Sequence, residues 1–173
     1  MFYAELHCIS NFTFLRGASH PEELVARAAE LGYKALAITD ECSLAGVVRA
    51  HVAAKKHGLP LIIGAEFLLQ EGLRLVLLAT DRKSYGQLSE LISVARRSAA
   101  KGSYLLSRET LIRHCPGGCL ALWLPGSDTE EADEEAVLWL ASLFPQRLWI
   151  AVELLLNGRQ NHHLRQLESL SEK

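Results

Sequence analysis

Short apolar runs alternate with segments of helical periodicity along the sequence, and this alternation restricts the fold more than any other feature. The apolar runs predict strands at residues 2–6, 35–39, 61–63, 66–69, 73–79, 119–124 and 148–154. Between them, helical spacing predicts helices at residues 21–31, 44–57, 84–95, 107–112 and 157–170, and the acidic stretch 127–135 begins another. Strands that alternate with helices indicate an α/β class with a parallel sheet, either a barrel or an open sheet.

Capping and stop signals place several helix ends. Ser19 and Glu22 have the spacing of a capping box, with Pro21 in the first turn of the helix that follows. Gly32 and Gly58 come directly after helical patterns, where glycine commonly ends a helix. These signals predict two helices within the first third of the chain.

Composition restricts the class of protein. The chain has 173 residues, of which 49% are apolar, so one domain with a substantial core is expected. A net charge of −2 gives no general attraction to nucleic acid or to an anionic membrane. The N-terminus lacks the pattern of a signal peptide, and the longest apolar runs, such as residues 75–79, are too short to cross a bilayer. We therefore expect a cytoplasmic location.

The four cysteines are Cys8, Cys42, Cys115 and Cys119. Only the last two are close in sequence, and no second pair or neighbouring histidine completes a zinc pattern. Buried, reduced thiols are therefore favoured over a structural zinc site.

Polar side chains at the carboxyl ends of the expected strands are the main candidates for chemistry, because glycine-rich dinucleotide and P-loop motifs do not occur. These side chains are His7, Asp40, Glu41, Glu66, Thr80, Asp81, Glu153 and Asn157. Imidazole and carboxylate groups from separate strands could converge on a divalent cation. A single histidine after a strand is more often an ordinary core or surface residue, so both interpretations stay open.

A modest basic cluster is a weaker candidate. It consists of Arg96, Arg97, Lys101 and Arg108. Such a cluster could contact a phosphate backbone, but a solvated helix end is the favoured interpretation. The three tryptophans lie among leucine and alanine, which favours core packing over base stacking.

Three segments carry a resemblance to a known family. Residues 6–17 (LHCISNFTFLRG), 35–40 (ALAITD) with 44–46 (LAG), and 62–66 (IIGAE) resemble, in order and spacing, the opening motifs of PHP domains. PHP domains of this kind form the N-terminal part of the C-family DNA polymerases of bacteria. Residues 5–21 are most similar to the error-prone, damage-inducible type of these polymerases.

The resemblance implies a distorted (β/α)7 barrel that stops before its last strands. Residues 1–173 would form the N-terminal PHP domain of a much longer polymerase chain. That parent would use Mg²⁺ and contact DNA and dNTPs, and this domain would contact the rest of the chain and no membrane. A truncated barrel with an exposed sheet edge could also form a dimer.

The resemblance also implies which residues correspond to metal ligands. His7, Asp40 and Glu66 match ligand positions of the family. Four positions that are often histidine in the family hold other residues, namely Ile9, Glu41, Arg74 and Asn157. Glu41 could act as a replacement ligand, whereas Arg74 could pair with Asp40 or Glu66. The expected metal content is therefore none, or at most one weakly held divalent ion.

These departures lead to three hypotheses for function. The leading one is a structural module without catalytic activity, within a DNA-directed DNA polymerase that acts in damage-induced mutagenesis and translesion synthesis. The alternative is an active metal-dependent phosphoesterase or a 3′–5′ proofreading nuclease. The third is a free-standing docking module that is never joined to a polymerase.

Overall fold

The computed structural model describes residues 3–126, 131–153 and 160–171. Its strands are β1 (Ala4–Glu5), β2 (Ala35–Ile38), β3 (Leu61–Leu68), β4 (Arg74–Leu78), β5 (Leu120–Leu124) and β6 (Leu148–Ile150). Its helices are α1 (Pro21–Glu30), α2 (Val47–His57), α3 (Arg82–Arg97), α4 (Arg108–Arg113), α5 (Glu131–Leu143) and α6 (Gln160–Ser171). The alternation of strands and helices expected from the sequence is confirmed.

The described strands form one sheet in chain order, from β1 to β6. The pairs β1–β2, β2–β3 and β5–β6 are parallel, but β3–β4 and β4–β5 are antiparallel. The parallel sheet expected from the sequence is therefore found only in part, because β4 runs antiparallel to both of its neighbours. A short turn with Gly72 at a φ of +82° joins β3 to β4, and a connection of this length permits only an antiparallel pair.

Strand β3 is longer than the sequence predicts. Residues 61–63 and 66–69 were expected as separate strands, yet Leu61–Leu68 is continuous. Its first half pairs with β2 and its second half with β4. Gly64 lies where these two pairings meet, and a Cβ at this position would come within 2.7 Å of the Leu77 carbonyl oxygen. The strand stays unbroken because glycine lets β4 approach this closely.

The start of α1 differs by one residue from the expected capping box. His20, and not Ser19, is the N-cap. The carboxylate that closes the box belongs to Glu23 rather than Glu22, and its Oε2 accepts a hydrogen bond from the His20 backbone N–H at 2.8 Å. Pro21 takes the first helical position, where its missing N–H costs nothing.

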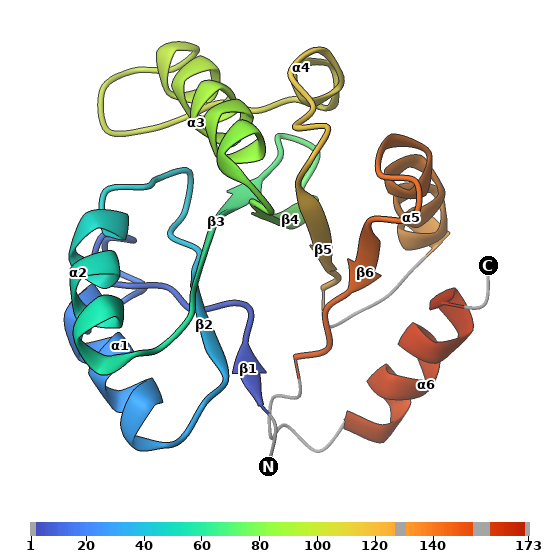
Figure 1. The fold of residues 1–173 in the computed structure, drawn as a ribbon. Coiled ribbons are helices and arrows are strands. Elements are labelled where there is room, and N and C mark those ends of the chain that lie inside the picture. The colour runs from blue at the N-terminus through green and yellow to red at the C-terminus, as the bar shows by residue number, and fades with distance from the viewer. Residues whose placement is uncertain (1–2, 127–130, 154–159, 172–173) are drawn as a thin grey trace.

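The sheet curls into a half-barrel with the helices on its outer side (Figure 1). Strands β1 and β6 are the two edges of the sheet, and residues next to both edges line a cavity of about 880 Å³. Inner-face side chains of the middle strands form an apolar cluster of Ala37, Val76, Leu78, Leu122 and Leu124. This architecture is that of a truncated barrel, as the sequence led us to expect.

The main core lies between the outer face of the sheet and helices α3 to α6. Phe67, Leu75, Leu77 and Trp123 point outward from β3, β4 and β5 into this core and are nearly or fully buried. A smaller core joins α1 and α2 to β2. No helix in the described ranges is both long and apolar enough to cross a membrane.

The cysteines are free thiols within these cores. Cys42 and Cys119 are buried, and Cys8 and Cys115 are half-buried. Burial raises the pKa of the Cys42 and Cys119 thiols to about 12. Both thiols are therefore protonated near neutral pH and act as small apolar side chains.

The two different environments of Gly64 and Gly86 give a stability test. We expect Gly64→Ala to destabilise the fold by about 1–3 kcal/mol, because the new methyl group meets the Leu77 backbone. Gly86→Ala should stabilise it by about 0.5–1 kcal/mol, because Gly86 lies within α3 and a Cβ there has open space. Urea unfolding of both variants checks this, and equal effects of one sign would contradict the close approach at Gly64.

Candidate functional site

The centre of the site is Glu66, a fully buried carboxylate on β3. Arg16 binds it with both terminal nitrogens, through Nη1 to Oε1 at 2.8 Å and Nη2 to Oε2 at 3.1 Å. His7 Nε2 lies 2.7 Å from Glu66 Oε2. Burial alone would raise the Glu66 pKa, but the hydrogen bonds from His7 and Arg16 outweigh it and hold the pKa at about 2. Glu66 is therefore a buried anion with two cationic partners.

His7 connects the two edges of the half-barrel. It follows β1, and its Nδ1 lies 3.1 Å from Oε1 of Glu153, which follows β6. Burial would lower the His7 pKa, but Glu66 and Glu153 together raise it above its ordinary value. With a carboxylate on each ring nitrogen, the imidazolium form can donate both hydrogen bonds. His7 thus joins the residue that follows β6 to the central carboxylate on β3.

Asp40 serves the loop that carries Arg16 and does not face Glu66. Its carboxylate accepts hydrogen bonds from the Ser10 backbone N–H, the Ser10 hydroxyl and the Thr13 hydroxyl, each at 2.7 Å. Only 1% of Asp40 is exposed. Gly17 closes this loop against Ser10, because a Cβ at Gly17 would lie 1.9 Å from the Ser10 carbonyl oxygen. Asp40 therefore positions Arg16 indirectly.

Glu41 forms the outer side of the site. Its Oε2 accepts from Arg16 Nη1 at 2.8 Å, and its Oε1 accepts from the Tyr104 hydroxyl at 2.9 Å. Arg96 donates to the backbone carbonyls of Glu41 and Cys42, and its guanidinium lies over the Tyr104 ring. Burial and the Glu41 carboxylate raise the Tyr104 pKa, so the hydroxyl stays protonated as a donor. Glu41 is thereby held as a partner of Arg16.

Arg74 is a more distant partner of the central carboxylate. Its Nε lies 3.7 Å from Glu66 Oε1, whereas the Asp40 oxygens are taken by Ser10 and Thr13. The two arginine side chains are similarly exposed, but Arg16 donates two hydrogen bonds to Glu66 and the Arg74 Nε lies beyond hydrogen-bond distance, so the interaction of Arg74 with Glu66 is weaker. Arg16, not Arg74, is the cation in direct contact with Glu66.

The side chains that could bind a divalent metal are already bonded to one another. Both Glu66 oxygens already accept hydrogen bonds from cations, and the free side of His7 faces Glu153. Within the described ranges, no group of three or more His, Cys, Asp or Glu side chains is arranged to hold a metal ion. The positive charge that a metal would bring is supplied by Arg16 and by protonated His7. These residues, as arranged, do not fit a metal cluster.

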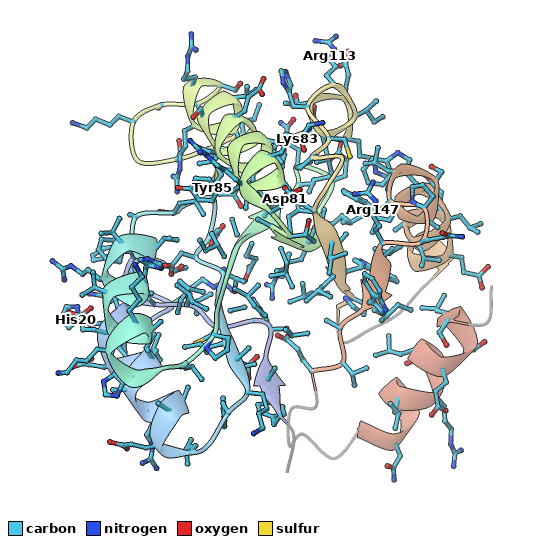
Figure 2. The ribbon with its side chains drawn as sticks, in the orientation of Figure 1. His20, Asp81, Lys83, Tyr85, Arg113 and Arg147 are labelled. Atoms are coloured by element: carbon cyan, nitrogen blue, oxygen red, sulfur yellow. The ribbon has the colours of Figure 1, made fainter. Side chains whose placement is uncertain are left out.

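The other candidates from the sequence have local roles or lie elsewhere. Ile9 is half-buried and offers no ligand atom, and Asn157 is outside the described residues. Asp81 caps α3 by accepting from the Ser84 N–H at 2.7 Å, and Thr80 donates to the Gly118 carbonyl. Figure 2 shows Asp81 at the end of α3 that lies next to the sheet.

The basic residues do not act as one surface. Arg96 is committed to the backbone beneath Glu41, and Arg108 lies over the Trp139 ring and pairs with Glu135 at 2.9 Å. Trp123 is a core residue, as expected, whereas Trp149 is half exposed and lines the cavity.

Arg16 and Tyr104 were missed by the sequence reasoning. Arg16 lies 25 positions before Glu41 and 50 before Glu66, and Tyr104 lies 63 positions after Glu41. Neither follows an apolar run of the kind used to choose candidates. The only signal for Arg16 was its place inside the first segment that resembles the PHP motifs.

A pair of matched substitutions distinguishes the two arginines. We expect Arg16→Met to lower the free energy of unfolding by roughly 2–4 kcal/mol, because buried Glu66 loses its bidentate partner. The loss is smaller than for a fully buried pair because Arg16 is partly exposed. Arg74→Met should cost less than about 1 kcal/mol. Chemical unfolding measures both, and a larger effect at Arg74 would overturn the assignment of Arg16 as the main partner.

The low pKa of Glu66 predicts an acid-labile contribution to stability. Its folded pKa of about 2 lies below the ordinary value of 4.5, so this contribution is present above pH 4.5 and is lost as the pH falls towards 2. The free energy of unfolding of the wild type should therefore fall over this interval. Glu66→Gln should flatten that part of the pH profile, and an unchanged profile would contradict the prediction.

Comparison with known proteins places this chain in a family. The chain is 59% identical to an error-prone DNA polymerase of Dechloromonas aromatica over 98% of its length, and 57% identical to one of Methylococcus capsulatus over 99%. It spans only 17% and 16% of these relatives, respectively.

Solved structures share the fold at low identity. A protein of Bifidobacterium adolescentis, provisionally described as a metal-dependent phosphoesterase, matches with a TM-score of 0.69 and 16% identity, over 99% of this chain and 83% of that one. An amidohydrolase of Chromobacterium violaceum matches with a TM-score of 0.60 and 18% identity, over 81% of this chain and 74% of that one. The PHP domain model matches residues 5–153, and this chain therefore belongs to the PHP domain family.

Proposed function

We propose that residues 1–173 are the N-terminal PHP domain of an error-prone DNA polymerase, and that this domain is a structural module without hydrolytic activity. Identities of 57–59% to such polymerases over nearly all of this chain support the first part. The observation that carries the second part is the state of Glu66, whose two oxygens are bound by Arg16 and His7.

The chemistry of an arginine explains why such a site would be inactive. A guanidinium neutralises a carboxylate, but it is not a Lewis acid and cannot coordinate a water molecule and lower its pKa. A phosphoesterase of this fold needs a metal that polarises the phosphate and lowers the pKa of a bound water. Arg16 can replace the charge of such a metal but not this reactivity.

The proposed parent is a DNA-directed nucleotidyltransferase. It would add nucleotides from dNTPs to a primer, with Mg²⁺ held by aspartates outside these residues. Its setting would be the cytoplasm, and its role would be replication past DNA damage, including repair-associated translesion synthesis. The contribution of this domain would be to stabilise the chain and to present a surface to the other domains.

Metal content and hydrolysis test the inactive-module proposal. The full-length protein, purified without chelators and dialysed, should hold substoichiometric Zn, Mn and Fe attributable to this domain. It should also hydrolyse single-stranded DNA no faster than its Glu66→Gln variant. Elemental analysis and a phosphodiesterase assay with added Mn²⁺ measure both properties.

Two results would overturn the proposal in different ways. A tightly bound metal that is lost in His7→Ala or Glu66→Gln would show that the site opens to a cation. A DNA hydrolysis activity that disappears with the same variants would show a nuclease. Mg²⁺-dependent primer extension that survives His7→Ala would support the parent activity and place it outside this site.

A further inference from the structure

Two neighbouring apolar side chains stand out from the loop that carries Arg16. Phe14 is 83% exposed and Leu15 is 90% exposed. Burying an apolar side chain stabilises a protein, and these two side chains contribute little of that stabilisation because most of their surface stays exposed in the described structure. We call Phe14 and Leu15 the loop tip.

The loop tip rests on a fixed base. The Thr13 hydroxyl is bonded to buried Asp40, and the Gly17 N–H donates to the Thr13 carbonyl at 2.9 Å. Arg16, directly after the tip, is fastened to Glu41 and Glu66. The exposure of the tip is therefore a property of a well-anchored loop rather than of a loose segment.

The backbone conformation at Leu15 is unfavourable for a leucine. Leu15 has a φ of +66°, a left-handed conformation that favours glycine or asparagine and disfavours leucine. A leucine here gains almost no burial within the described structure to offset that strain. Strain and exposure at the same position indicate a residue selected for contact with another surface.

The charges near the loop favour a protein surface over nucleic acid. Arg16 is already paired with Glu41 and Glu66. Arg49, which lies over the Phe12 ring, is 3.8 Å from Glu22. These cations are balanced by carboxylates, and the chain has a net charge of −2, so a phosphate backbone would find little attraction here.

We propose that the loop tip docks into an apolar pocket on the part of the polymerase chain that follows residue 173. This inference rests on the proposed function. Most of the length of the polymerase relatives lies outside the region that this chain matches, so the remainder of such a chain offers the nearest large surface. Attachment in one polypeptide also gives such a contact a high effective concentration.

Photo-crosslinking of the full-length protein tests the contact. A photoreactive benzoylphenylalanine replaces Phe14, and after irradiation the crosslinked peptides are mapped by mass spectrometry. We expect crosslinks to residues beyond 173 of the same chain, with a yield that is unchanged on dilution. The matched control carries the probe in place of Val48, which is 72% exposed on α2, and should give a much lower yield.

A second variant tests the role of Leu15 without threatening the fold. Leu15→Asn suits the positive φ, so the domain should unfold at an unchanged or higher denaturant concentration. In the probe-carrying protein the same substitution should lower the crosslink yield several-fold. A yield unchanged by Leu15→Asn would show that Leu15 takes no part in the contact.

Other outcomes of the crosslinking overturn the proposal. Crosslinks that disappear on dilution would identify a second copy as the partner, and crosslinks that require added primer–template DNA would identify nucleic acid. A yield no higher than that of the Val48 control would mean that the tip stays free. Primer extension by the same preparation reports the proposed function separately, so an active polymerase without the crosslink would overturn the docking alone.

Discussion

The ion pair between Arg16 and Glu66 is the interaction on which the arrangement of this domain depends. Glu66 is fully buried on β3, in the half of the strand that pairs with β4. A carboxylate in that position is tolerated only with charged hydrogen-bond partners. Arg16 provides two such bonds and His7 a third, and this fixes the ends of β1, β3 and the intervening loop relative to one another.

Two further groups of contacts support that pair from opposite sides. Asp40 holds the loop through Ser10 and Thr13, so that Arg16 reaches Glu66 from a rigid base. Tyr104, which lies in the connection between α3 and α4, donates a hydrogen bond to Glu41 and thereby fixes the second carboxylate that binds Arg16. The site is a closed set of paired charges, which stabilises the fold and supports the proposal of a structural role. The same contacts hold Phe14 and Leu15 in the exposed position from which we propose that they dock onto the rest of the polymerase chain.

The source of the positive charge at the site distinguishes this chain from a protein that binds a metal there. Two solved structures share the architecture at 16–18% identity, which shows the fold alone. In this chain the positive charge beside Glu66 comes from arginine and histidine side chains. A charge that is built into the chain contributes to folding at every metal concentration, whereas a metal site contributes only when it is loaded.

The sequence by itself determined the alternation of strands and helices and the candidates His7, Glu41 and Glu66, because apolar period and the residues after each strand are local properties. The alternation allowed a barrel or an open sheet, and only the resemblance to PHP domains favoured the truncated barrel. It did not determine that β3 is one bent strand, because the close approach of β4 at Gly64 depends on a distant segment. It placed Asp40 among the ligand candidates, and the folded chain turns that carboxylate to the loop. Only the tertiary structure decided that Arg16 and Tyr104 belong to the site, since long side chains from remote positions meet where the strands converge, and no local pattern encodes that meeting.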